Sequence, residues 1–82
     1  MNRRRAGEYD LLIGEQIRAA RLAAGLSQEA LGDLIGVTFQ QVQKYERGTN
    51  RISAGKLYEI SDALKVPITR FYEPLKTARR MY

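Results

Sequence analysis

The chain has 82 residues, which allows one domain with a modest hydrophobic core. It contains no cysteine and no histidine, so disulfides, thiolate metal sites and the commonest general base are excluded. The net charge of +5 at pH 7 favours a polyanionic partner, of which nucleic acid is the usual one. Apolar runs are short and interrupted, so we expect a cytoplasmic protein with no membrane span or secretory signal.

The first predicted helix covers about residues 11–24, with Asp10 as its N-cap and Gly25 at its end. Apolar residues recur there at spacings of four, three and four, which predicts an inward face made of Ile13, Ile17, Ala20 and Ala24. Residues 1–8 precede this helix as a basic arm that contains Arg3, Arg4 and Arg5. The arm either wraps DNA or enters an A·T-rich minor groove, or else it is only a solubilising tail.

Two short helices joined by a tight turn are predicted in the segment QEALGDLIGVTFQQVQKYER, residues 28–47. Ser27 caps the first, residues 28–35, and Gly36 ends it, because glycine enters the left-handed conformation at no steric cost. Thr38 caps the second, residues 39–47, with Gln41 completing a capping box. Val42 and Tyr45 are expected to point inward, which leaves a polar outer face rich in hydrogen-bond donors.

A fourth helix is predicted at about residues 54–64, with Ser53 as its N-cap. The Val66-Pro67 pair breaks the chain, and a last short helix is expected at about residues 68–73, ending at Pro74. The sequence therefore predicts an all-α, compact five-helix bundle. We expect residues 1–8 to form a flexible arm, residues 9–74 the domain, and residues 75–82 a basic tail.

The stretch from Ile13 to Glu73 resembles the Cro/cI-type (XRE family) helix-turn-helix domain of phage and bacterial repressors. The residues that carry the resemblance are IGEQIRAARLAAGLSQEALGDLIGVTFQQVQKYERG, followed by LYEISDALKVPITRFYE. It implies a lambda-repressor-like fold in which helices 2 and 3 form the helix-turn-helix. One departure is Gly32, where the family usually has alanine; glycine there is expected to cost up to about 1 kcal/mol of helix stability.

The resemblance assigns base contacts to the outer face of the helix at residues 39–47. We expect Phe39, Gln40, Gln43 and Lys44 to reach base edges. Gln40 suits adenine N6 and N7, and Lys44 suits either guanine or a phosphate. Phe39 either contacts a thymine methyl or packs beneath the preceding helix, and the sequence leaves these alternatives even.

Backbone contacts are expected from the residues that flank this helix, namely Gln28, Thr38, Arg47, Asn50 and Arg51. They would hold the orientation on the duplex without reading its sequence. In the resembling family an arginine late in helix 1 pairs with the glutamate that ends helix 3, which implies a structural ion pair between Arg21 and Glu46.

These features together predict a sequence-specific regulator of transcription that binds double-stranded DNA, most simply a repressor on a pseudo-palindromic operator. Such modules bind as two-fold dimers, so we expect a homodimer whose contact comprises Phe71, Tyr72, Leu75, Met81 and Tyr82. The alternative for Phe71 is that it closes the core, which would not account for Tyr82. The alternative is an antitoxin or adaptor whose DNA binding is coupled to a protein partner. No catalytic residue, metal site or cofactor is expected, because the nine acidic residues show no paired constellation and histidine is absent.

Overall fold

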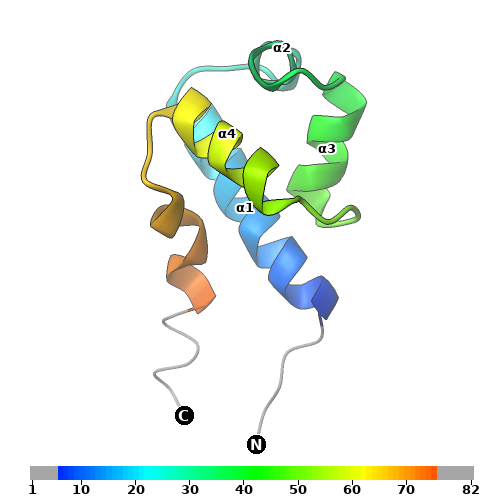
Figure 1. The fold of residues 1–82 in the computed structure, drawn as a ribbon, viewed down its shortest axis with the longest axis vertical. Helices are drawn as coiled ribbons and strands as arrows, with labels where there is room; N and C mark the ends of the chain where they lie inside the picture. The colour runs from blue at the N-terminus through cyan, green and yellow to red at the C-terminus, as the bar shows by residue number, and fades with distance from the viewer. Residues whose placement is uncertain (1–5, 76–82) are drawn as a thin grey trace, which may run out of the picture.

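The structure, a computed structural model, describes residues 6–75 and contains helices but no strand within that range. The elements in chain order are α1 (Ala6–Ala23), α2 (Gln28–Ile35), α3 (Phe39–Arg47), α4 (Ala54–Leu64) and a 3₁₀ helix, η1 (Ile68–Tyr72). Figure 1 shows α1 running obliquely through the molecule, with α3 on one side and η1 on the other. The predicted all-α, five-helix architecture is confirmed.

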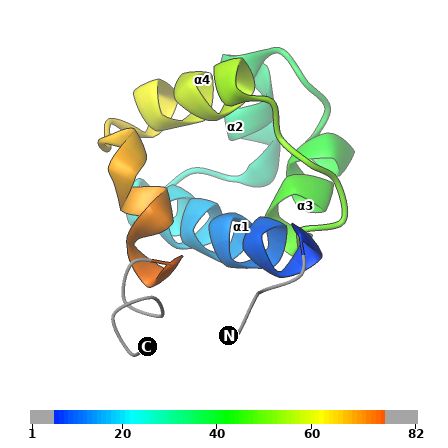
Figure 2. The ribbon, with the colours of Figure 1, turned by 60° about the horizontal axis from the view of Figure 1, so that its bottom comes forward.

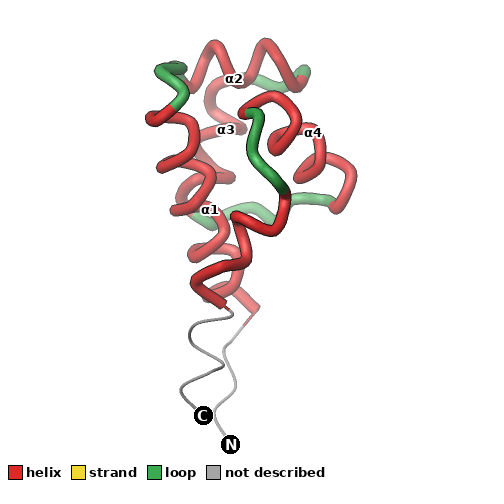
Figure 3. The backbone as a smooth tube through the Cα atoms, turned by 90° about the vertical axis from the view of Figure 1, so that its left-hand side faces the viewer, coloured by secondary structure: helices red, strands yellow, loops and turns green. Residues whose placement is uncertain are grey.

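The helices surround one core. Viewed as in Figure 2, α1 and α4 lie on opposite sides, while α3 closes one end and η1 the other. The tube in Figure 3 shows the same helices joined by short loops, with η1 lying against α1. The core residues come from every element, and they are Ile17, Ala20, Leu31, Ile35, Val42, Tyr45, Leu57, Ile60, Leu64 and Phe71.

The start of α1 differs from the sequence prediction. The helix begins at Ala6, five residues before the expected start, so Asp10 lies inside the helix and does not cap it. Glu8 in the first turn is stabilised by the positive end of the helix dipole. At the other end, Ala24 lies beyond the last helical residue and is exposed, so its predicted place on the inward face was wrong.

The other helix starts follow their side-chain caps. The hydroxyls of Ser27, Thr38 and Ser53 accept hydrogen bonds from the backbone N–H three residues on, at 3.0, 3.2 and 3.0 Å. Each bond satisfies one of the N–H groups that a helix start leaves without an intrahelical partner. The predicted bounds of α2, α3 and α4 therefore agree with the structure.

Four left-handed residues separate the elements. Three are glycines, Gly25, Gly36 and Gly48, with φ between 72° and 74°. The fourth is Lys65, which ends α4 at φ 60° although it carries a Cβ. A non-glycine residue in this conformation is strained, so α4 ends on a residue that is locally unfavourable.

The last predicted helix forms as a tighter 3₁₀ helix over Ile68–Tyr72. Residues 73–75 are helical as well, so Pro74 does not end the helical segment, contrary to the prediction from the sequence. Proline is compatible with the first turn of a helix, because its missing N–H would have no intrahelical partner there.

Two glycines let helices approach closely. A Cβ on Gly14 of α1 would collide with the backbone carbonyls of Tyr45 and Glu46 in α3. A Cβ on Gly32 would lie 2.6 Å from the carbonyl oxygen of Val37, which is backbone and cannot swing aside. The close approach for which a small residue was expected at position 32 is therefore confirmed, and the Cβ of an alanine there would require the turn to shift.

Candidate nucleic-acid interface

The outer face of α3 is the surface for which the sequence predicts base contacts. Val42 and Tyr45 are buried against the core, which turns the opposite side of the helix to solvent. Gln40, Lys44 and Arg47 are all exposed on that side. The helix thus presents amide, ammonium and guanidinium donors along two turns, which suits the acceptor-rich floor and walls of the DNA major groove.

The remaining residues of this face are less exposed. Gln43 and Gln41 are half-buried, and Phe39 at the helix start is 44% exposed. Phe39 therefore keeps nearly half of its surface open to solvent in the free protein, and it is absent from the set of buried core residues. Its predicted contact with a thymine methyl remains a prediction.

A buried ion pair fixes α3 to α1. The Arg21 Nε donates to Glu46 Oε2 at 2.6 Å, and Arg21 Nη2 donates to Glu46 Oε1 at 3.1 Å. Both side chains are almost fully buried, at 7% and 3% exposure. A third donation, from Arg21 Nη1 to the carbonyl oxygen of Leu26 at 2.7 Å, ties the α1–α2 loop to the same group.

Gln28 belongs to this network as well as to the start of α2. Its Nε2 donates to Glu46 Oε1 at 3.1 Å, and the residue is half-buried. The predicted phosphate contact by Gln28 would therefore use an amide whose orientation is already held by Glu46. Thr38, assigned to the same class of contact, is exposed and its hydroxyl accepts from the backbone N–H of Gln41.

The loop after α3 is fastened to the N-terminal part of α1. Arg51 is 76% exposed at its side chain, and its Nε lies 3.6 Å from Asp10 Oδ2. Asn50 is half-buried and lines a small cavity of about 190 Å³ together with Asp10 and Tyr72. Gly48 packs against the backbone of Leu11, where a Cβ would collide. Arg51 is thus positioned at the rim of the α3 surface, while Asn50 faces partly inward.

The residues expected at a dimer contact have different environments. Phe71 is fully buried in the core, so of its two predicted roles the closing of the core is confirmed and the surface contact was wrong. The hydrophobic side chain closes the core between α1, α4 and η1. Tyr72 is 37% exposed and Leu75 is half-buried, which leaves both at the surface. Met81 and Tyr82 lie outside the described residues, as does the arm at Arg3–Arg5.

Three residues near this surface have contacts that were not predicted from the sequence. Gly14 allows α1 and α3 to touch, and its signal was a glycine in the middle of a helical apolar pattern. Asp10 lies 3.6 Å from the exposed Arg51, a proximity that no local pattern indicates. Lys56 of α4 donates from Nζ to the carbonyl oxygen of Ile35 at 2.8 Å and so binds the C-terminal end of α2.

Two other classes of feature are absent from the described part of the chain. Among residues 6–75, no group of three or more acidic residues is placed to hold a metal ion. Within the same range, none of the helices is both long and apolar enough to cross a membrane.

Comparison with known proteins agrees with this geometry. The helix-turn-helix family model HTH_3 matches residues 17–71, which include α2, α3 and α4 entirely. The chain belongs to the HTH_3 helix-turn-helix family. This HTH_3 chain is 52% identical over 73 residues to the HTH-type transcriptional regulator y4aM of Sinorhizobium fredii, covering 89% of this chain and 51% of the relative.

A second sequence relative and one solved structure are also similar to this chain. Over 67 residues the HTH_3 chain is 54% identical to a transcriptional regulator in the ATPase CF(0) region of Rhodospirillum rubrum, covering 82% of this chain and 62% of that protein. The restriction-modification controller protein C.AhdI of Aeromonas hydrophila superposes with a TM-score of 0.78 at 28% identity, covering 83% of this chain and 99% of that one. The HTH_3 chain spans about half the length of the sequence relatives that it matches.

Proposed function

We propose that this HTH_3 chain is a transcriptional regulator that binds double-stranded DNA at specific sequences, acting as a repressor with α3 in the major groove. The observation that carries the proposal is the exposed row of Gln40, Lys44 and Arg47 on a helix whose other face is locked into the core. A recognition helix has to be held rigidly as well as carry donors, because ordering a mobile segment on binding costs free energy and lowers the affinity for DNA. The buried Arg21–Glu46 pair supplies that rigidity.

The residues divide into two roles. Gln40 and Lys44 read base edges, with Gln40 matched to adenine and Lys44 to guanine O6 and N7 or to a phosphate. Gln43 and Phe39 contact bases at the edges of the same footprint. Phosphate contacts come from the flanking exposed or half-buried residues, which are Gln28, Thr38, Arg47, Asn50 and Arg51.

The HTH_3 chain acts as a homodimer in this proposal. One α3 of nine residues covers only a few base pairs, so a second copy is needed for an operator of useful specificity. Tyr72 and Leu75 remain candidates for the contact, since both are at the surface near the end of η1. The relatives named as transcriptional regulators support the regulatory role, which would be exercised on bacterial or phage DNA in the cytoplasm.

Selection of duplexes from a random library by the full chain tests this function. We expect an enriched, two-fold symmetric site whose half-sites are centred about one helical turn apart, roughly 10 base pairs. Enrichment of a single asymmetric half-site would remove the homodimer from the proposal and keep the recognition by α3. A library that stays random after repeated rounds, with the protein folded, would contradict sequence-specific binding.

A further inference from the structure

The Gln28 side chain, to which the proposed function assigns a phosphate contact, is already held in the free protein. Its Nε2 donates to Glu46 Oε1 at 3.1 Å, across 18 positions of sequence. A carboxylate oxygen only accepts hydrogen bonds, so this contact turns the amide nitrogen of Gln28, and not its carbonyl oxygen, toward Glu46. The side-chain amide therefore has a defined orientation before any partner binds.

Glu46 is itself fixed by Arg21. The guanidinium donates to both carboxylate oxygens, at 2.6 and 3.1 Å, and the Glu46 side chain is only 3% exposed. Glu46 Oε1 thus accepts from Arg21 and from Gln28 at the same time. A buried carboxylate with three donors has little freedom to turn, so it is a rigid acceptor for the Gln28 amide.

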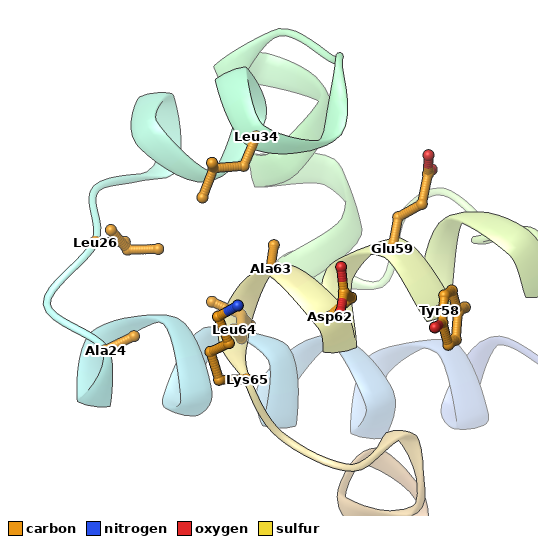
Figure 4. A pocket seen from close by; sticks show the side chains of 9 residues that line it. All are labelled: Ala24, Leu26, Leu34, Tyr58, Glu59, Asp62, Ala63, Leu64 and Lys65. Atoms are coloured by element: carbon orange, nitrogen blue, oxygen red, sulfur yellow. The ribbon is translucent and has the colours of Figure 1, made fainter.

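The backbone in front of Gln28 is held by the same ion pair. Arg21 Nη1 donates to the carbonyl oxygen of Leu26 at 2.7 Å, and the Leu26 N–H donates to the carbonyl oxygen of Arg21 at 3.1 Å. Figure 4 shows the Leu26 side chain pointing from the α1–α2 loop into an open groove between α2 and α4, above Ala63. The residue two positions before Gln28 is therefore fixed through its N–H, its carbonyl group and its side chain.

One N–H of the Gln28 amide remains for a partner. Nε2 carries two protons, of which Glu46 takes one, and no residue between 6 and 75 supplies an acceptor for the other. Gln28 is half-buried, so its amide stands at the edge of the protein. A phosphate oxygen is an acceptor, which matches the remaining N–H and not the carbonyl oxygen of the amide.

The charges of this network are compatible with a phosphate. Glu46 alone would repel a phosphate oxygen bound to the same amide nitrogen, because two negative charges would lie close together in a partly dry site. The Arg21 guanidinium is in direct contact with the carboxylate and offsets its charge. The carboxylate therefore orients the amide without excluding an anion from the second N–H.

We propose that Glu46 is a positioning residue for DNA binding that acts through Gln28. The Arg21–Glu46 pair orients the Gln28 amide so that its second N–H bonds a DNA phosphate without further ordering of the side chain. Immobilising a free side chain on binding would lower the affinity about two- to tenfold, a loss that the preformed contact avoids. This role rests on the proposed function, which supplies the DNA phosphate as the partner of Gln28.

Gln28→Ala in two backgrounds tests the role on the duplex site selected from the random library. One background is the natural chain, and the other carries Arg21→Met with Glu46→Leu, which removes the ion pair without leaving a buried charge. In the natural chain Gln28→Ala should weaken binding about tenfold, as expected for a hydrogen bond to a charged group. In the second background the loss should be about twofold, because ordering the free amide offsets most of the bond.

Arg51→Ala is the matched control, since Arg51 is exposed in the loop after α3 and lies near Asp10, away from the ion pair. Its loss of affinity should be the same in both backgrounds. If the second background instead reduced the effects of Gln28→Ala and Arg51→Ala alike, Glu46 would act only by keeping the helices in place, and the positioning role would be overturned.

Duplexes with one neutral methylphosphonate in place of a phosphate supply a readout that a merely structural role would not change. At the phosphate bound by Gln28, the natural chain should lose affinity on neutralisation, and the Gln28→Ala variant should not. The background without the ion pair should show a reduced loss at that phosphate and unchanged losses at the others. A uniform change at every phosphate would contradict the proposal.

Nuclear magnetic resonance of the free natural chain tests the hold on Gln28 without DNA, and it applies even if the double variant does not fold. The Gln28 side-chain amide protons should exchange with water on the order of tenfold more slowly than those of Gln40, an exposed glutamine on α3. Equal exchange at the two side chains would show that Glu46 does not hold the amide, and would overturn the proposal.

Two outcomes separate this role from the function on which it rests. Equal losses for Gln28→Ala in both backgrounds, or no loss in the natural chain, would overturn the role of Glu46 while sequence-specific binding by α3 stands. A folded natural chain that binds all duplexes equally would instead contradict the proposed function, and the role of Glu46 with it.

Discussion

Arg21 and Glu46 form a two-pronged buried ion pair across 25 residues of sequence, with 2.6 Å between Nε and Oε2. The pair joins the last turn of α1 to the end of α3, and it also holds Gln28 at the start of α2. Three elements of the DNA-binding surface thus depend on one carboxylate. Burial makes the loss of either partner costly in folding free energy, because the remaining charge has no water to replace its partner.

Arg21→Met should lower the free energy of unfolding by about 3–5 kcal/mol, since it leaves Glu46 buried and unpaired. The double variant with Glu46→Leu should recover most of that loss, because it removes the orphaned charge along with its partner. Urea titration followed by circular dichroism measures both. A loss below about 1 kcal/mol for Arg21→Met would mean that the pair is hydrated in solution.

Gly14→Ala should destabilise the protein although alanine is the better helix former. The added Cβ would meet the carbonyls of Tyr45 and Glu46, so α1 and α3 would have to separate, at a cost of about 1–3 kcal/mol. Gly55→Ala is the matched control, because a Cβ there has no atom within 4 Å and should add about 0.5–1 kcal/mol. Thermal unfolding of the two variants should therefore shift in opposite directions, and a parallel shift would contradict the close packing.

Gln40→Ala and Lys44→Ala should each reduce the preference for the selected site over random DNA, by about 1–3 kcal/mol per lost base contact. Arg51→Ala should weaken binding to all sequences alike and lower the slope of log affinity against log salt by about one. Fluorescence anisotropy with both duplexes over a range of salt separates the two behaviours. Unchanged specificity in the Gln40 and Lys44 variants would show that α3 does not read the bases through these side chains.

Lys65→Gly should stabilise the protein by about 0.5–1 kcal/mol. Glycine relieves the left-handed strain at φ 60°, worth about 1–2 kcal/mol, and part of this gain is offset by the greater freedom of glycine in the unfolded chain. Lys65→Ala is the control, since it removes the charge and keeps the strained Cβ. Chemical denaturation should show a higher free energy of unfolding for Lys65→Gly and not for Lys65→Ala. An equal increase in both variants would mean that the loss of the lysine charge causes the effect.

The starts of α2, α3 and α4 could be predicted because each depends on local chemistry. Ser27, Thr38 and Ser53 each bond to a backbone N–H three residues away, so the pattern that fixes the helix start is present in the sequence itself. The predicted cap of α1, Asp10, instead lies inside the helix and near Arg51. The place of Asp10 beside a residue 41 positions later is decided by packing, which a linear pattern does not contain.

The candidate site divides in the same way. The outward direction of Gln40 and Lys44 follows from the helical period together with the apolar positions Val42 and Tyr45, so the sequence determined it. The burial of Phe71, the hold of Glu46 on Gln28 and the contact of Gly14 with α3 were decided by the tertiary structure. Each of these joins residues from different helices, and the distances between helices are set by how all the side chains of the core fill space together.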